Sequence, residues 1–366
     1  MDSQAFFSQT YAEARSKFLA AAAAARLALQ SHPHPLPGHD GETLAMDVAR
    51  FGATDARHLL MLTSACHGVE GFCGSGVQNA LLADNAFLAT AAQAGVAVLF
   101  VHALNPHGFS WWRRNTHENV DLNRNWQNFA QPLPANPGYD QLADAIVPAH
   151  WPPAPEVQAR LTAYADQHGA MALQAAISGG QYRHPAGLFY GGQAPTWSRQ
   201  TFSKVLQEHG TQCTRLAWID LHTGLGASGV GERIFAARHE PAALARARSW
   251  WGAGVTSTQE GTSSSAPLTG LISAAVHDGC PQAELTAIAL EYGTLPLTDM
   301  INALRADQWR ENHPQAPAAE REALRRQSRD AFYVDTPEWK ASILTQARDA
   351  AQQAVSGLAR PVAPTA

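Results

Sequence analysis

Four runs of apolar residues, with few polar side chains among them, predict strands that are buried on both faces. They occupy residues 59–62, 96–104, 216–221 and 284–292. Runs of this kind are typical of a parallel sheet that helices cover, whereas a sheet with one wet face shows alternating polar and apolar positions. Two shorter segments, 44–51 and 234–237, are further strand candidates.

Helical periodicity lies before, between and after these runs. Helices are predicted at residues 4–30, 74–92, 154–178, 196–210, 241–251 and, with a proline-rich break near 312–317, from 297 to about 360. The order strand, helix, strand over residues 59–104 predicts a βαβ unit, which requires a parallel strand pair and a right-handed crossover. We therefore expect an α/β protein.

Three segments without periodicity are predicted to be loops. Residues 32–41, rich in Pro and Gly, are expected to form a linker. Residues 105–128, NPHGFSWWRRNTHENVDLNRNWQN, form a polar loop of a length that in compact domains is usually functional or disordered. Its three tryptophans favour a functional loop. Residues 179–192, GGQYRHPAGLFYGG, are an aromatic loop bounded by glycines.

Composition limits the classes of protein that the chain can belong to. The 366 residues carry a net charge of −5 and no block of like charges, which argues against a nucleic-acid partner. The four cysteines are scattered as free thiols would be in a reducing compartment. With neither a signal-peptide pattern nor an apolar membrane span, a soluble cytoplasmic protein without a membrane partner is expected.

Two potential metal ligands follow the first apolar run. His67 and Glu70 stand three residues apart in the turn HGVE, and an imidazole and a carboxylate at this spacing can bind one ion. The alternative is a strand-end histidine beside a solvated acid at a helix start. The motif by itself does not decide between the two interpretations.

Two later strands also end in polar residues. DLHTG at 220–224 and EYGT at 291–294 each contain a glycine, and ligands of α/β sheets bind at the carboxyl ends of strands. His67, Glu70 and His222 would form a two-histidine, one-carboxylate zinc set, with Glu291 as a candidate general base. Asp220 either orients His222 or makes a purely structural contact. The alternative for Glu291 is a helix cap.

The long loop contributes cations. Arg113, Arg114 and Arg124 could bind a carboxylate with their guanidinium forks or stabilise an oxyanion near a metal. Alternatively, they pair with Glu118 and Asp121 in a structural network.

Taken together, the order HGVE, NPHGFSWWRRNTHENVDLNRNW, DLHTG and EYGT resembles the M14-type zinc carboxypeptidase superfamily, in its DUF2817-like branch. Aspartoacylase and succinylglutamate desuccinylase share HxxE, DLNR and the later His. The resemblance implies a mixed, largely parallel central sheet flanked by helices on both faces. It also implies one catalytic domain over residues 1–366, on which helical segments at 1–31 and 297–360 pack.

The resemblance also implies roles for individual residues. His67, Glu70 and His222 match the ligands of a single zinc ion, and Glu291 matches the general base that acts on zinc-activated water. Asn123 and Arg124 match the pair that binds a substrate carboxylate. Arg114 looks like the residue that polarises the scissile carbonyl, and Arg113 is its rival.

One departure from the superfamily affects the expected substrate. Metallocarboxypeptidases usually place a substrate-binding tyrosine between the last zinc ligand and the catalytic Glu, and residues 223–290 contain none. Tyr182, Tyr190 or Tyr292 are possible substitutes. We expect a zinc-dependent metallocarboxypeptidase that cuts an amide next to a free carboxylate. The alternatives are an N-acyl-amino-acid deacylase and a non-catalytic binding protein. Natural substrate and oligomeric state are not predicted.

Overall fold

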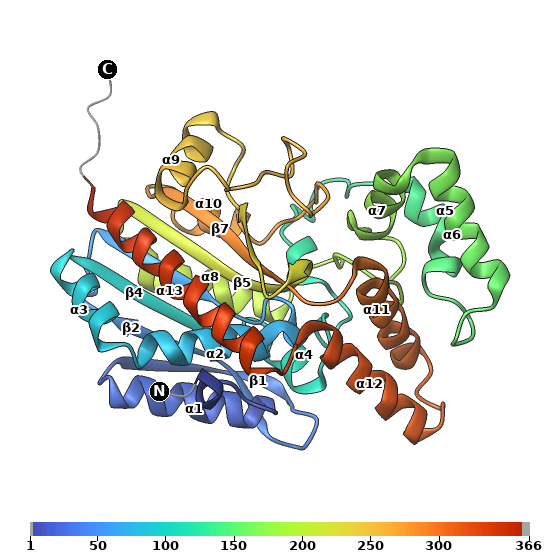
Figure 1. Ribbon diagram of the computed structural model, residues 1–366, viewed down its shortest axis with the longest axis horizontal. Coiled ribbons are helices and arrows are strands. Elements are labelled where there is room, and N and C mark those ends of the chain that lie inside the picture. The colour runs from blue at the N-terminus through green and yellow to red at the C-terminus, as the bar shows by residue number, and fades with distance from the viewer. Residues whose placement is uncertain (1–2, 361–366) are drawn as a thin grey trace.

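The computed structural model describes residues 3–360, which are built around one seven-stranded sheet of order β1-β2-β4-β3-β5-β7-β6. The strands are β1 (Ala28–Pro37), β2 (Thr43–Phe51), β3 (His58–Thr63), β4 (Val96–His102), β5 (Arg215–Ser228), β6 (Gly231–Phe235) and β7 (Glu284–Gly293). The inner strands β4, β3, β5 and β7 are parallel, while β1, β2 and β6 pair antiparallel (Figure 1). The predicted fold class is confirmed.

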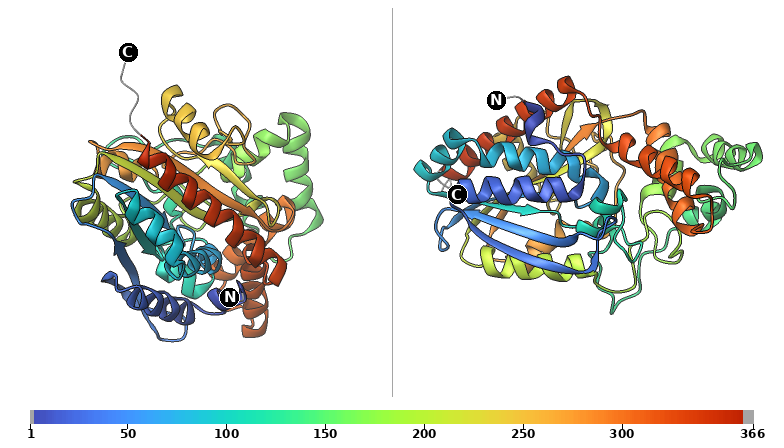
Figure 2. Two further views of the ribbon diagram at one scale, coloured as in Figure 1. Left: turned by 60° about the vertical axis from the view of Figure 1, so that its left-hand side comes forward. Right: turned by 90° about the horizontal axis from the view of Figure 1, so that it is seen from below.

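Side chains of the inner strands alternate between two hydrophobic cores. Leu60 and Leu62 of β3 belong to one core, and Leu59 and Met61 belong to the other. Because both faces are buried, the strand reads as a continuous apolar run. The first core is covered by α1 (Tyr11–Ala24), α2 (Gly71–Leu82), α3 (Asn85–Gln93), α9 (Pro241–Trp251) and α13 (Pro337–Ala359). The second is covered by α8 (Trp197–Gly210) and α10 (Ala274–Gly279), as Figure 2 shows for α8.

Two predicted segments at the N-terminus differ from the structure. The predicted helix over 4–30 contains the short 3-10 helix η1 (Ser3–Phe6) and α1, and it ends at Ala24. The predicted linker at 32–41 is wrong for its first half, because β1 continues to Pro37. Prolines are tolerated there since β1 is an edge strand with only one neighbour.

Other predicted helices are divided by local signals. The predicted helix 74–92 is two helices, because Asp84 caps the N-terminus of α3 through hydrogen bonds to two backbone N–H groups. The prediction for 154–178 contains α6 (Pro155–His168) and α7 (Ala170–Ser178), which Gly169 separates in a left-handed conformation (φ 93°). Residues 131–155, which are rich in proline and for which we predict neither helix nor strand, contain α5 (Pro137–Ile146). Residues 297–360 contain α11 (Leu297–Asn312), α12 (Ala318–Phe332) and α13.

The carboxyl ends of the parallel strands are covered by long connections. Residues 105–128 contain the short helix α4 (Pro106–Trp111) and the 3-10 helix η3 (Leu122–Arg124). Helices α5, α6 and α7 form a group at one end of the molecule, and α11 lies beside it (Figure 1). Among residues 3–360, none of the helices combines the length and apolar character needed to cross a membrane.

Candidate active site

The polar residues at three strand ends meet in space. His67 follows β3, at the start of the 3-10 helix η2 (Gly68–Glu70), and Glu70 is the N-cap of α2. His222 lies in β5, directly opposite Glu291 of β7 in the parallel register. The carboxylate of Glu70 therefore sits at the positive end of a helix, where a negative charge is stabilised.

His67, Glu70 and His222 converge on one point. Their potential ligand atoms all lie within 4.8 Å of one another, and all three side chains are buried. Glu70 Oε1 is 2.8 Å from His67 Nδ1, and Glu70 Oε2 is 2.9 Å from His222 Nδ1. Burial opposes ionisation of Glu70, but the two histidines prevail and lower its pKa below the usual range.

A carboxylate holds the outer nitrogen of each histidine. His222 Nε2 is 2.8 Å from Asp220 Oδ2, and His67 Nε2 is 3.3 Å from Asp121 Oδ1. The Nε2–H of His222, which donates to Asp220, leaves the lone pair of Nδ1 for a metal, whereas His67 Nε2 also lies 2.7 Å from the Arg114 guanidinium, which can only donate. The alternative that Asp220 makes only a structural contact unrelated to His222 does not match this geometry.

The donor set fits zinc. The two Nδ1 atoms face each other at 3.2 Å. Two nitrogen ligands of a tetrahedral zinc, each about 2.05 Å from the ion, would lie roughly 3.3 Å apart. Two histidines and one carboxylate are also a ligand set of catalytic zinc that leaves a fourth position open.

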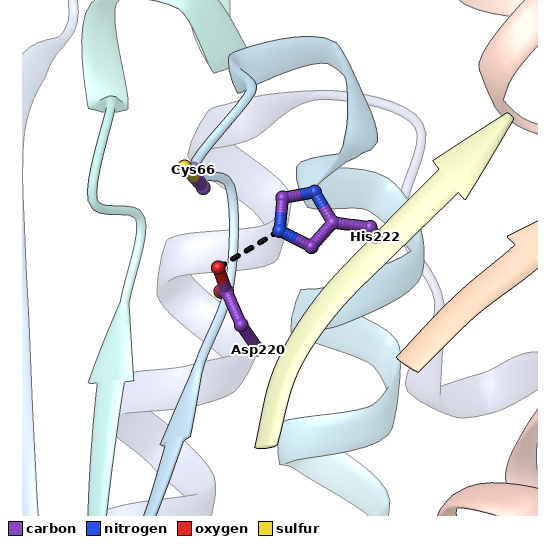
Figure 3. A group of neighbouring side chains, drawn as sticks. All are labelled: Cys66, Asp220 and His222. Atoms are coloured by element: carbon purple, nitrogen blue, oxygen red, sulfur yellow. Dashed lines mark hydrogen bonds and ion pairs between the residues drawn. The ribbon is translucent and has the colours of Figure 1, made fainter. Parts of the chain in front are cut away.

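A second group of potential ligands, Cys66, Asp220 and His222, lies on the other side of the His222 ring (Figure 3). Its chemistry favours no metal. Burial raises the pKa of the Cys66 thiol well above its ordinary value, and nearby Asp220 adds to the effect. The thiol therefore keeps its proton, and Asp220 is already hydrogen-bonded to His222.

Glu291 has the environment of a proton acceptor. Burial raises its pKa to about 7, and the negative charge of Glu70 acts in the same direction. Glu291 Oε1 accepts a hydrogen bond of 3.0 Å from the backbone N–H of Leu225, which leaves Oε2 available. The residue before Leu225 is Gly224 with φ 142°, a conformation that side chains rarely adopt.

Arg114 reaches this centre because its loop is bonded to the HGVE turn. The carbonyl groups of Arg114 and Arg113 accept hydrogen bonds from the N–H groups of Gly68 and Val69. The Arg114 guanidinium is 2.9 Å from Asp121 Oδ2, 3.4 Å from Glu70 Oε1 and 2.7 Å from His67 Nε2. Arg114 also lines the cavity. The arginine that the resemblance assigns to the scissile carbonyl therefore lies beside the potential metal ligands.

Arg113 points to a different region. Its guanidinium lies 3.2 Å from Asp307 Oδ2 and 3.4 Å from Glu311 Oε2 on α11. It is buried and does not line the cavity. Of the two arginines, the structure thus brings only Arg114 to the histidines.

Arg124 and Asn123 lie at another wall of the cavity. Arg124 is 2% exposed and donates to the carbonyl groups of Ser178 and Asn123. Within residues 3–360 it has no carboxylate at ion-pair distance, and burial lowers its pKa, although an arginine remains charged. Asn123 Oδ1 accepts the N–H of Ile272, which leaves its Nδ2 for a ligand.

These residues line one open cavity with about 1100 Å³ of empty space including its mouth. Apolar side chains from β6, β7, α11 and the loop before α10 form much of the remaining wall. None of Tyr182, Tyr190 and Tyr292 lines it, whereas Phe189 does. Sequence reasoning did not assign roles to Phe189 or the Leu225 N–H. Nor did it link Asp121 to His67, although Asp121 stands in the same VDLNR motif as Asn123 and Arg124.

Comparison with known proteins adds a family and several structures. The sequence profile of the family described as "Protein of unknown function (DUF2817)" matches residues 7–346. Among curated proteins, none matches the chain.

Similar solved structures include three proteins. Carboxypeptidase A from Helicoverpa armigera is 10% identical, with 88% of this chain and 74% of that chain covered and a TM-score of 0.44. The metallo-carboxypeptidase from Burkholderia cenocepacia is 13% identical, with 94% of this chain and 68% of that chain covered and a TM-score of 0.41. Thrombin activatable fibrinolysis inhibitor is 11% identical, covering 92% and 74%, with a TM-score of 0.46.

Proposed function

From the premise that the chain belongs to the family described as "Protein of unknown function (DUF2817)", we propose that it is a zinc-dependent hydrolase. It cleaves an amide bond next to a free carboxylate, as a metallocarboxypeptidase does. The observation that carries the proposal is the meeting of His67, Glu70 and His222, with each histidine held by an aspartate, beside a glutamate whose pKa is about 7.

The proposed cofactor is one zinc ion per chain, held by His67, Glu70 and His222. When bound, zinc supplies a Lewis acid that polarises a carbonyl oxygen and makes water easier to deprotonate. Asp121 and Asp220 keep the ligand nitrogens of the two histidines oriented.

Residues of the chain transfer the proton, stabilise the developing negative charge and bind the substrate. Glu291 Oε2 takes the proton of the attacking water, whose oxygen forms a bond to the carbonyl carbon. The same oxygen atom of Glu291 then passes that proton to the nitrogen of the breaking C–N bond. Arg114 donates to the carbonyl oxygen as it gains negative charge. Arg124 and the Asn123 amide bind the free carboxylate of the substrate.

A second candidate, deacylation of an N-acyl amino acid, is favoured by one observation. No tyrosine is among the cavity-lining residues of the described chain, although a substrate-binding tyrosine is usual in metallocarboxypeptidases. Both reactions use the same metal, base and carboxylate clamp. They differ in whether the group beyond the scissile carbonyl is a peptide or a small acyl group.

The experiment measures zinc content and hydrolysis together. The zinc-loaded protein is assayed on C-terminally free peptides, on their C-terminal amides and on N-acyl amino acids. We expect one zinc per chain, cleavage of free acids only, and loss of both zinc and activity in His222→Ala. His277→Ala, which changes a histidine outside the cavity, serves as the control and keeps both. Equal zinc content in the wild type and His222→Ala would contradict the metal site.

We also propose the expected single catalytic domain over residues 1–366. Within the described residues 3–360, α1 and α13 contribute to the same hydrophobic core as the sheet, which supports it. All four cysteines are buried free thiols, which supports our proposal of a reducing compartment such as the cytoplasm.

A further inference from the structure

We propose that Phe189 is a positioning residue that holds the guanidinium groups of Arg114 and Arg124 for an anionic substrate. The inference rests on the proposed function, in which Arg124 binds the free carboxylate of that substrate and Arg114 donates to its carbonyl oxygen. Phe189 belongs to the aromatic loop 179–192 and takes part in none of the chemical steps described above.

The ring of Phe189 contacts both arginines. The Cζ atom of Arg114 lies 5.1 Å from the ring centroid, and the Cζ atom of Arg124 lies 5.5 Å from it. Both distances are within the range of a cation–π attraction, which strengthens when the pair is shielded from water. Phe189 is 4% exposed and lines the cavity, so this condition is met.

A neutral aromatic ring can position Arg124 without neutralising its charge, whereas a carboxylate would neutralise it. Arg124 donates only to backbone carbonyl groups, so its charge is not neutralised by an ion pair in the described part of the chain. A glutamate or aspartate at this place would fix the guanidinium but would compete with the substrate carboxylate. The π face attracts the cation and leaves its charge available.

The backbone of Phe189 is held in an unfavourable conformation. Its φ of 53° lies in the left-handed region, which is an outlier for a bulky residue. Hydrogen bonds at Phe189 and at the next residue maintain it: the Phe189 carbonyl accepts from Gln181 N–H, and the Tyr190 carbonyl accepts from Asp121 N–H at 2.8 Å. The loop is thereby tied to the aspartate that pairs with Arg114. Strain that the surroundings impose in this way is concentrated at functional sites.

The chain contains a matched control. Trp112 is also an aromatic residue in the left-handed region, with φ 57°. Its ring also contacts two arginines, Arg325 at 3.7 Å and Arg329 at 5.4 Å. Trp112 ends α4, packs against α12 and does not line the cavity. Its two arginines therefore serve packing, whereas those of Phe189 face a ligand site.

The test compares binding of an acid and its amide. L-phenylalanine, which is a product of both candidate reactions and is not cleaved further, and L-phenylalaninamide are titrated by calorimetry into the zinc-loaded wild type, Phe189→Leu, Phe189→Tyr and Trp112→Leu, and the melting temperature of each protein is measured. We expect Phe189→Leu to weaken binding of the acid about tenfold and to leave the amide unchanged. Phe189→Tyr, which keeps the π face, should bind the acid within about twofold of wild type, and so should Trp112→Leu.

Each result has a defined meaning. Wild-type affinity for the acid in folded Phe189→Leu, or equal weakening in Phe189→Leu and Trp112→Leu, would overturn the positioning role. Normal binding of the acid by Phe189→Tyr together with weakened binding by Phe189→Leu supports it. If Phe189→Leu does not fold, tenfold weaker binding of the acid by folded Phe189→Tyr would overturn the role. Failure of the proposed function would give a different result. If the wild type bound the acid and the amide with equal affinity, the protein would have no site for the substrate carboxylate, and both proposals would be overturned. If the protein showed the expected binding but no hydrolysis, only the proposed reaction would be contradicted.

Discussion

Two groups of charged residues contain the neighbouring arginines Arg113 and Arg114, and they differ in how completely their charges are paired. The α11 cluster, made of Arg113, Asp307, Arg310 and Glu311, contains two cations and two anions. Asp307 lies 3.2 Å from Arg113 and 2.6 Å from Arg310, and Glu311 contacts both arginines. Every charge in this cluster therefore has a partner.

The candidate active site, which contains Arg114, leaves two charged groups without such partners. Glu291 accepts one backbone hydrogen bond and has no cation at ion-pair distance among residues 3–360. Arg124 has backbone carbonyl groups and the Phe189 ring, but no carboxylate. A fully paired buried cluster contributes to structure, whereas an incompletely paired one is ready for a metal, a proton or a substrate.

The largest effect is expected for Glu291→Gln. In its proposed role as general base, Glu291 would account for roughly 10²–10⁴-fold of the rate, so we expect kcat to fall by at least this factor. Zinc content and melting temperature should not fall, because Glu291 neither holds the metal nor makes an ion pair. Steady-state kinetics, elemental analysis and thermal unfolding are measured on one preparation. Near-normal turnover by folded, zinc-loaded Glu291→Gln would remove Glu291 from the mechanism.

The α11 cluster should show the reverse pattern. Asp307→Ala leaves two buried arginines with one acid fewer, and breaking a buried pair in this way costs about 3–5 kcal/mol of unfolding free energy. We expect kcat and KM to change little at a temperature where the variant is folded. Denaturant unfolding measures the loss. Asp144→Ala removes the exposed pair with Arg160 and serves as the control, with an expected loss below about 1 kcal/mol. Equal losses in the two variants would contradict the comparison.

The pH dependence of stability separates Glu291 from the paired acids. In metal-free protein its pKa of about 7 lies above the ordinary 4.5, so between these pH values the folded state holds a proton that the unfolded state releases. The free energy of unfolding therefore decreases as the pH rises through this window. Metal-free Glu291→Gln should gain stability over wild type from pH 4.5 to 7, by roughly 3 kcal/mol at most. A constant difference across this range would contradict the raised pKa.

The smallest effect is expected for Arg124→Ala. Loss of a partly desolvated charged hydrogen bond costs about 1.5–3 kcal/mol, so KM for free-acid substrates should rise about tenfold or more. Zinc content should stay at the wild-type value. Arg160→Ala, a substitution of an exposed arginine, is the control and should leave KM unchanged. An unaltered KM in Arg124→Ala would show that the carboxylate is bound elsewhere.

The predictable parts of the fold follow from one physical rule. Strands buried on both faces must be apolar throughout, so β3, β4, β5 and β7 were visible in the sequence. The edge strand β1 was not, because its three prolines suggest a linker and only its partner β2 makes it a strand. The division between α2 and α3 depends on the Asp84 cap, a local signal that the helical periodicity conceals.

The candidate site could also be predicted only in part. His67 and Glu70 follow β3, and His222 and Glu291 lie toward the carboxyl ends of β5 and β7. Because ligands bind at the carboxyl ends of parallel strands, the sequence could predict that these residues meet. The separation of Arg113 from Arg114 was not predictable, because it depends on where α11 packs. Phe189 was also missed, because its position depends on hydrogen bonds between two loops that are far apart in sequence.

The prolines of β1 also have a consequence for assembly. Pro33, Pro35 and Pro37 remove three N–H donors from an outer strand that is largely exposed. A strand from a second molecule would find carbonyl groups there without the donors that normally hold a new strand in register. The protein thus carries, on the side of the sheet away from β6, a built-in obstacle to sheet extension and to the aggregation that begins with it.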